Sequence, residues 1–422
     1  MADAASLTST RRFHGAELER LRKRTVGALV AGVALGSTGH IAAVTVATIV
    51  ATHIAGGTTA WSGAPSATVV LGAAAGASAL SWLMVRRGRR VGLAVGYVVS
   101  VIGAIVATIA IISMSLPLLL AGTVLIGFGN ASNQLSRYVS ADLATPDRRA
   151  SAIGLVVWGA TIGAVVGPNL VAPAGNIAVA LGLPELAGPY LVPIVFVGAA
   201  ALLSFSLLRP DPYELADESS RHDTQADRSV AVSFASVFAR PNVPVAMVAL
   251  VAGQFVMVLI MTMTPLHMAA HGHDLAAVGV VISGHTFGMF GLSPISGRLT
   301  DRFGSVPVIL SGLAVVAIAS VLAAIAPPDG GLLLFLALFL LGYGWNLGYV
   351  AGSALLTHGL TLAERTRIQG LTDTLIWSSA AIASLGSGIV LAYAGYAILG
   401  LMGAALVVVP MLLVAARRSA VA

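Results

Sequence analysis

Long apolar segments recur along the whole chain and are separated by short polar connections. Each segment is long enough to cross the hydrocarbon layer of a membrane as a helix, which takes roughly 20 residues. The pattern predicts twelve such helices, over residues 25–54, 67–85, 91–113, 117–138, 150–172, 189–208, 243–266, 275–297, 305–326, 332–355, 366–392 and 396–416.

Composition agrees with this pattern. Of the 422 residues, 57% are hydrophobic and only 9% are charged, which excludes an ordinary water-soluble enzyme. Helices are expected because each backbone amide inside the membrane must be bonded within its own segment. The chain has no cysteine, so disulfides, thiolate catalysis and thiolate metal sites are excluded.

One long polar stretch, residues 209–242, divides the twelve spans into six and six. The predicted fold is an all-α membrane protein with twelve transmembrane helices in two six-helix bundles. Its parts are a cytoplasmic tail at 1–24, a first bundle at 25–208, a cytoplasmic linker at 209–242 and a second bundle at 243–422.

The basic residues fall on one side of this topology. With the amino terminus inside, all 23 Lys and Arg lie in inner segments or at the inner ends of spans. Because such a bias sets orientation, we expect a multi-pass protein of the plasma (inner) membrane with both termini cytoplasmic, and no nucleic-acid partner. The alternative is that one weak segment, such as 67–85, does not cross.

A shift of 216 residues superimposes polar and glycine positions of the two halves. It places Arg86 on Arg302, Asn130 on Asn346, Arg149 on Arg365 and Gly154 on Gly370. A shared offset across loops and spans indicates two like-oriented copies, which suits two bundles rocking about a central cavity.

The end of the eighth span reads GRLTDRFG over residues 297–304 and fits the pattern G-x-L-x-D-R-x-G. The chain thereby resembles the major facilitator superfamily. Glycines permit a tight turn here, while Asp301 and Arg302 suit a breakable ionic latch at the inner face, with Asp301 on a helix amino terminus. The inner-gate residues that we expect are Arg86, Asp142, Gly297, Asp301, Arg302 and Gly304.

The matching first-half loop keeps the basic and glycine positions, but Ser81 and Val85 replace the glycine and the aspartate of the pattern. The resemblance implies that the arginine after this position pairs with an acid near the inner end of span four, and Asp142 is the candidate. The alternative is a basic loop that serves only as a topology signal.

Span five contains Gly154, Gly163 and Gly167-Pro168, which resembles the signature of proton-coupled exporters in this family. Small residues at such spacing allow close helix approach across a bundle interface. Val171 and Ala172 stand where that signature closes on two glycines. The alternative is ordinary close packing.

Asp373 is the one acid that lies clearly within a predicted span. An ionisable group at membrane depth marks a pathway, a pairing partner or a proton site. Asp373 is therefore either a proton-coupling carboxyl or a latch to Arg86 or Arg87. His285 and His40 are further proton-coupling candidates, and the alternative for both is a neutral histidine bonded between helices.

Polar and aromatic residues recur at intervals of three and four in spans four and ten, which places each set on one helix face. The resemblance implies that spans one, four, seven and ten line the cavity. The substrate-binding candidates are His40, Asn130, Asn133, Gln134, Arg137, Gln254, Trp345, Asn346 and Tyr349. Alternatively, Arg137 reaches the headgroups and the amides bond neighbouring helices.

After span seven, His267, His271 and His273 cluster on the outer side, where a metal or a pH-sensing role is an open alternative; we expect no metal. The function we prefer is secondary active, proton-coupled export of small amphipathic organic compounds by alternating access, without cofactor or catalysis, in a monomer. The alternatives are a symporter or facilitator that takes up a polar metabolite, and a non-transporting receptor.

Overall fold

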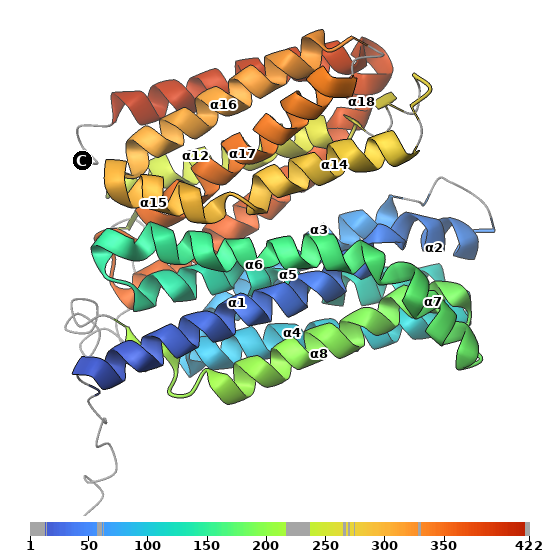
Figure 1. Cartoon of the computed structure of the whole chain (residues 1–422), viewed down its shortest axis with the longest axis horizontal. Helices are drawn as coiled ribbons and strands as arrows, with labels where there is room; N and C mark the ends of the chain where they lie inside the picture. Colours follow the sequence, from blue (N-terminus) through green and yellow to red (C-terminus); the bar gives the residue numbers. More distant parts are fainter. Residues whose placement is uncertain are drawn as a thin grey trace, which may run out of the picture.

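The computed structural model describes residues 13, 15–56, 61, 63–216, 237–264, 267–268, 271–273, 275–327 and 331–417. Within these residues, all regular structure is helical. Two stacked bundles lie with their long helices side by side, the first in blue to green and the second in yellow to red (Figure 1). The predicted all-helical fold of two bundles is confirmed.

The first bundle contains helices α1 to α8, and the short helix α9 follows it. Their bounds are α1 Gly15–Thr45, α2 Ala47–Ile54, α3 Ala64–Arg87, α4 Arg89–Ile112, α5 Leu116–Leu143, α6 Arg149–Asn169, α7 Val171–Ala180, α8 Gly188–Leu207 and α9 Pro212–Leu215. The second bundle contains α12 Asn242–Met261, α14 Leu275–Phe290, α15 Ser293–Phe303, α16 Ser305–Ile325, α17 Gly331–Leu355 and α18 Leu362–Ala416. Of the expected linker, residues 217–236 lie outside the described part of the chain.

Eleven helices of the described chain are long and apolar enough to cross a membrane. The expected eighth span is broken into α14 and α15, because Pro294 in the first turn of α15 lacks the N–H that a continuous helix needs. The last two spans run together as α18, and a positive φ of 81° at Gly395 marks the turn between them. The structure therefore accommodates the twelve predicted crossings.

The helix ends that carry basic residues meet at one end of the molecule. The start of α1, the α3–α4 and α5–α6 connections, the α15–α16 connection and the end of α18 all lie at the left of Figure 1. We call this the basic end. The cross-bundle hydrogen bonds and ion pairs described below lie in the half of the molecule nearest to it.

Small residues bring the two bundles into close contact at two related places. A Cβ on Gly154 of α6 would overlap the carbonyl oxygen of Ser293 on α15, and a Cβ on Gly370 of α18 would overlap Ser81 on α3. Gly154 and Gly370 are 216 residues apart, the offset of the sequence repeat. The α6–α15 and α3–α18 contacts are thus equivalent contacts of the two halves.

Candidate functional site

A buried ion pair joins the two bundles. Nη2 of Arg137, on α5, lies 2.6 Å from Oδ1 of Asp373, on α18, and their side chains are 1% and 2% exposed. Arg137 stands six residues before the end of α5, roughly 9 Å from the basic end at 1.5 Å per residue. The pair therefore joins the two bundles about two turns of α5 inward from the basic end.

The guanidinium of Arg137 is held on every side. Its Nε donates to Ser353 Oγ at 3.1 Å, its Nη1 to the carbonyl of Gln134 at 2.6 Å, and its Nη2 to the hydroxyl of Tyr138 at 2.8 Å. Its carbon lies 4.1 Å from the ring centre of Tyr138 and 4.2 Å from that of Tyr349. Arg137 is thus anchored in the protein, and the alternative in which it reaches the headgroups is wrong.

The two oxygens of Asp373 differ. Oδ1 accepts hydrogen bonds from Arg137 and, at 3.3 Å, from the Tyr138 hydroxyl. Oδ2 is buried and accepts no hydrogen bond from the described residues. The alternative latch to Arg86 or Arg87 is wrong, because the partner of Asp373 is Arg137 and the guanidinium of Arg86 lies 4.0 Å over the ring of Trp82.

Aromatic side chains extend this cluster toward α12. The ring of Trp345 stacks on that of Tyr349 with centres 4.4 Å apart, and its Nε1 donates to Gln254 Oε1 at 2.8 Å. The Tyr349 hydroxyl donates to Gln134 Oε1, across the bundle interface. Asp373, Arg137, Tyr349, Trp345 and Gln254 thus form one continuous chain of contacts from α18 through α5 and α17 to α12.

Two of the expected substrate contacts bond neighbouring helices instead. Asn346 donates to the carbonyl of Met289 at 2.6 Å and to Ser293 Oγ at 2.7 Å, and accepts from Ser296 at 2.5 Å. Asn133 accepts from the Tyr97 hydroxyl at 2.9 Å. These contacts support the alternative in which the two amides hold helices together.

Other candidates keep polar atoms available. The side chain of Asn130 is buried, at 8% exposed, and forms no hydrogen bond with the described residues, and Nδ1 of half-buried His40 lacks a partner among them. Gln134 is half-buried beside Tyr349. Because α1 and α5 pack together, these side chains are the best placed of the predicted set to bind a ligand.

His285 is fully buried between α14 and α17. Its Nδ1 lies 2.8 Å from the carbonyl oxygen of Leu338, so this nitrogen carries the hydrogen. This geometry is that of a neutral histidine bonded between helices, and a proton-coupling role for His285 stays a prediction.

A second ionic cluster lies at the basic end. Asp142 of α5 accepts from Arg89 of α4 at 2.5 Å and lies 3.9 Å from Nη1 of Arg365 on α18. Arg89 also donates to Gln369 at 3.2 Å.

The expected pairing of Asp142 with Arg86 is therefore wrong. The partner of Asp142 is Arg89, a later arginine of the same loop, which turns inward at the start of α4, whereas Arg86 is exposed. The sequence did not distinguish these arginines, although the repeat offset relates Arg365 to Arg149.

Asp301 binds a helix terminus of the other bundle. Its carboxylate accepts from the backbone N–H groups of Ala150 and Ser151 at 3.1 and 3.0 Å, at the amino end of α6. The chain turns sharply after it at Gly304, whose φ is 85°, and exposed Arg302 lies over Phe303.

The other half caps its equivalent helix in a different way. Val85 replaces the aspartate there, and α18 is capped by its own Thr361–Glu364 capping box. The side-chain oxygen of a cap satisfies helix N–H groups that have no partner within the helix.

The glycines of span five serve different contacts. Gly154 packs against α15 of the other bundle. Gly163 packs against Ser37, and Gly167 against Thr38 and Ile41, all on α1 of the same bundle, while Pro168 lies in the last turn of α6. Close packing thus accounts for all three glycines, and Gly154 alone bears on the bundle interface.

Two of the outer histidines make ring contacts. The ring of His267 lies 4.2 Å from that of Tyr396 and 4.4 Å from that of His271. Burial, together with His271 and His273, lowers the pKa of His267. The described residues hold no group of three side chains that could hold a metal ion.

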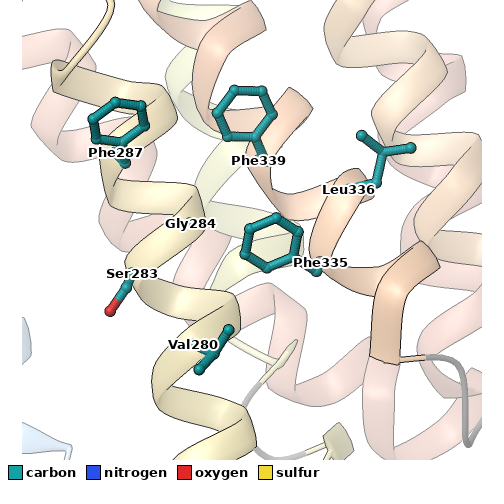
Figure 2. A pocket seen from close by; sticks show the side chains of 7 residues that line it. All are labelled: Val280, Ser283, Gly284, Phe287, Phe335, Leu336 and Phe339. Carbon is teal, nitrogen blue, oxygen red and sulfur yellow. The ribbon is translucent and has the colours of Figure 1, made fainter.

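An apolar groove of about 790 Å³ lies between α14 and α17 (Figure 2). Its lining side chains, mostly aromatic and aliphatic, are Val280, Ser283, Gly284, Phe287, Phe335, Leu336 and Phe339. None of the predicted site residues lines it, so the polar cluster around Arg137 and Asp373 is the better candidate for a functional site.

Comparisons with known proteins agree with this architecture. The chain is 38% identical over 384 residues to the uncharacterized MFS-type transporter YdeG of Bacillus subtilis, covering 91% of this chain and 89% of that protein. It is 30% identical over 348 residues to the riboflavin transporter RfnT of Brucella anthropi, covering 81% and 84%. The structure of the proton:xylose symporter XylE superimposes with a TM-score of 0.75 at 13% identity, covering 93% of this chain and 95% of that one, which shows the shared fold.

A family model, described as Major Facilitator Superfamily, matches residues 26–384 and 248–421. With two helical bundles, eleven described spans and a cross-bundle ionic site, this chain belongs to the major facilitator superfamily and is a membrane transporter.

Proposed function

We propose that the protein is a proton-coupled secondary transporter that exports small amphipathic organic compounds, with Asp373 as the coupling carboxyl. The observation that carries the proposal is the free oxygen of the cross-bundle pair. Oδ2 of Asp373 is buried and accepts no hydrogen bond from the described residues, while Oδ1 binds Arg137 of the other bundle. A proton on Oδ2 would neutralise the carboxyl and weaken the pair.

The Arg137–Asp373 pair couples protonation of Asp373 to the separation of the two bundles at the basic end. Separating Arg137 from an ionised Asp373 leaves two charges without partners in a poorly polar interior, which is costly. Protonation from the opposite end removes that cost and lets the basic end open. There water favours ionisation, the proton leaves, and attraction to Arg137 closes the basic end again, carrying bound substrate outward.

The basic end faces the cytoplasm of the plasma membrane, because Lys and Arg gather there. Residues 209–242 link the two bundles, and since one chain contains both, it acts as a monomer.

A flux assay in proteoliposomes tests the proposal. The vesicles contain a pH dye inside and receive riboflavin or ethidium as probes, with an imposed pH gradient. We expect proton movement opposite to that of a transported probe, its loss in Asp373→Asn, and its retention in the control Asp147→Asn, whose side chain is 74% exposed at the basic end. Proton-driven flux retained in Asp373→Asn would eliminate this carboxyl as the coupling group.

The second candidate function is uptake of a polar metabolite with protons. The polar atoms of Asn130, His40 and Gln134 that remain available to a ligand favour a polar substrate, and one relative is a riboflavin transporter. If protons and probe move in the same direction in the same assay, proton-coupled uptake is the function and export is rejected.

A further inference from the structure

At the basic end, the start of α4 and the end of α8 form a corner in which cations surround one exposed aromatic ring. Phe205 of α8 is 53% exposed. The guanidinium carbons of Arg90 and Arg209 lie 5.5 and 5.0 Å from the centre of its ring, and Arg24 of α1 donates to the carbonyl of Arg209. Helix α8 packs against both α1 and α4 (Figure 1). These residues of three segments therefore form one surface, which we call the Phe205 corner.

Among the described residues, the nearest acid forms no ion pair with the guanidinium groups of this surface. The carboxylate of Asp211 accepts from the backbone N–H groups of Arg89, Arg90 and Tyr213 at 3.1, 3.0 and 2.9 Å, so it caps the amino end of α4. Within the described chain, the ion pairs include no partner for Arg90 or Arg209, and Nε of Arg90 is buried without a hydrogen bond. The guanidinium groups thus keep donors for an anion from outside the protein.

The corner lies where a lipid headgroup would meet the protein. On the same helix, Leu202 lies three residues before Phe205, on the same face, and is 72% exposed, so it adds an apolar side chain next to the cations. Arginine donates two parallel hydrogen bonds to a phosphate, and aromatic rings concentrate at the membrane–water interface. Basic groups at this level attract anionic lipids.

We infer that the Phe205 corner, formed by Arg24, Arg90, Phe205 and Arg209, binds the phosphate headgroup of an anionic phospholipid whose acyl chains lie along α8. Arg90, at the start of α4, and Arg209, in the segment after α8, hold the phosphate from two sides, and the face of Phe205 fixes both guanidinium groups beside it. The site differs from the transport site and does not depend on the proposed function.

Native mass spectrometry of the full chain tests this site, with phosphatidylglycerol and phosphatidylcholine supplied as an equal mixture. We expect the wild type to retain phosphatidylglycerol preferentially, and Arg90→Gln combined with Arg209→Gln to reduce that preference about tenfold. The control Arg148→Gln removes an exposed cation at the same end, paired with Asp147 at 3.8 Å, and should retain the preference.

Three results would overturn the inference. They are equal retention of the two lipids by the wild type, an unchanged preference in the double variant, and displacement of the lipid by inorganic phosphate at equal concentration, which would assign the site to a free anion. If the double variant does not fold, Phe205→Leu keeps every charge and should still weaken the preference; an unchanged preference in that variant contradicts the proposed geometry.

Discussion

Replacing Asp373 with Asn is the most direct perturbation of the cross-bundle pair. The change keeps the shape of the side chain and removes the charge that faces Arg137, 2.6 Å away. Removing one partner of a buried ion pair costs about 3–5 kcal/mol. Arg137 retains Gln134 and Ser353 as acceptors, so we take the lower value, about 3 kcal/mol.

This cost falls on the state in which the basic end is closed, because Arg137 reaches water once that end opens. At 1.4 kcal/mol per factor of ten, the equilibrium between closed and open basic ends should shift about a hundredfold toward open. The variant should also lose the dependence of this equilibrium on pH, since its amide does not ionise.

Spin-label distances measure the shift directly, because the chain has no cysteine of its own. Cysteines at Arg148 and Phe303 place one label on each bundle at the basic end, and cysteines at Ile177 and Leu332, which are 57% and 83% exposed, do so at the opposite end. In Asp373→Asn we expect the first distance to lengthen and the second to shorten.

The double variant Arg137→Gln with Asp373→Asn is the matched control. With both charges gone, no buried charge lacks a partner, so the closed basic end should recover. The reasoning is refuted if Asp373→Asn keeps the wild-type distances at both ends, or if the double variant is as open as the single one.

Three further changes test the other contacts. Asp301→Asn weakens the cap on α6 across the bundles by about 1 kcal/mol and should open the basic end about fivefold by the same labels, while Asp147→Asn should not. Gly154→Val places side-chain atoms in the α6–α15 contact and should abolish transport at unchanged expression, whereas Gly198→Ala, whose Cβ meets its nearest atom at 3.9 Å, should be tolerated. Burial and the nearby Arg149 and Arg365 lower the pKa of His358 in the folded protein, so the free energy of unfolding should fall as the pH drops below 6.5, the ordinary pKa of histidine. In His358→Gln, the thermal unfolding temperature should therefore decrease less over the same drop in pH.

Each of these expectations has a contrary result. Equal label distances in Asp301→Asn and wild type would make the cap irrelevant to closure. Normal transport by Gly154→Val would show that the two helices separate at little cost. Identical acid sensitivity with and without His358 would assign that sensitivity to other groups.

Much of the architecture could be predicted from sequence because it depends on segment length and on the side where charges lie. Neither property changes when the predicted end of a helix is wrong by several residues. The break of span eight is visible only as Pro294, and the resulting kink needs the packing of α14 and α15 to be known.

The sequence predicted which residues form the candidate site better than it predicted which of them pair with one another. Spacing placed Arg137 on one face of its helix and Tyr349 with Trp345 on one face of theirs, and the family resemblance turned both faces toward the cavity. The same resemblance implied the wrong alternative partner for Asp373 and the wrong arginine for Asp142. Which of several neighbouring arginines turns inward depends on the start of α4 and on Asp211, a contact between segments 122 residues apart. Tyr138 has no polar spacing signal of its own, because its hydroxyl matters only once Arg137 and Asp373 are brought together.

The unequal capping of α6 and α18 gives the molecule a preferred order of movement. Asp301 must leave α6 when the bundles separate, whereas Thr361 and Glu364 travel with α18 and keep it capped. Parting α3 from α18 therefore breaks no helix cap, while parting α15 from α6 exposes two amide groups to solvent. The Arg137–Asp373 ion pair that ties α18 to α5 weakens when Asp373 takes up a proton, whereas the cap on α6 does not, so we expect protonation to loosen the α18 side first and the α6–α15 seam to act as the pivot.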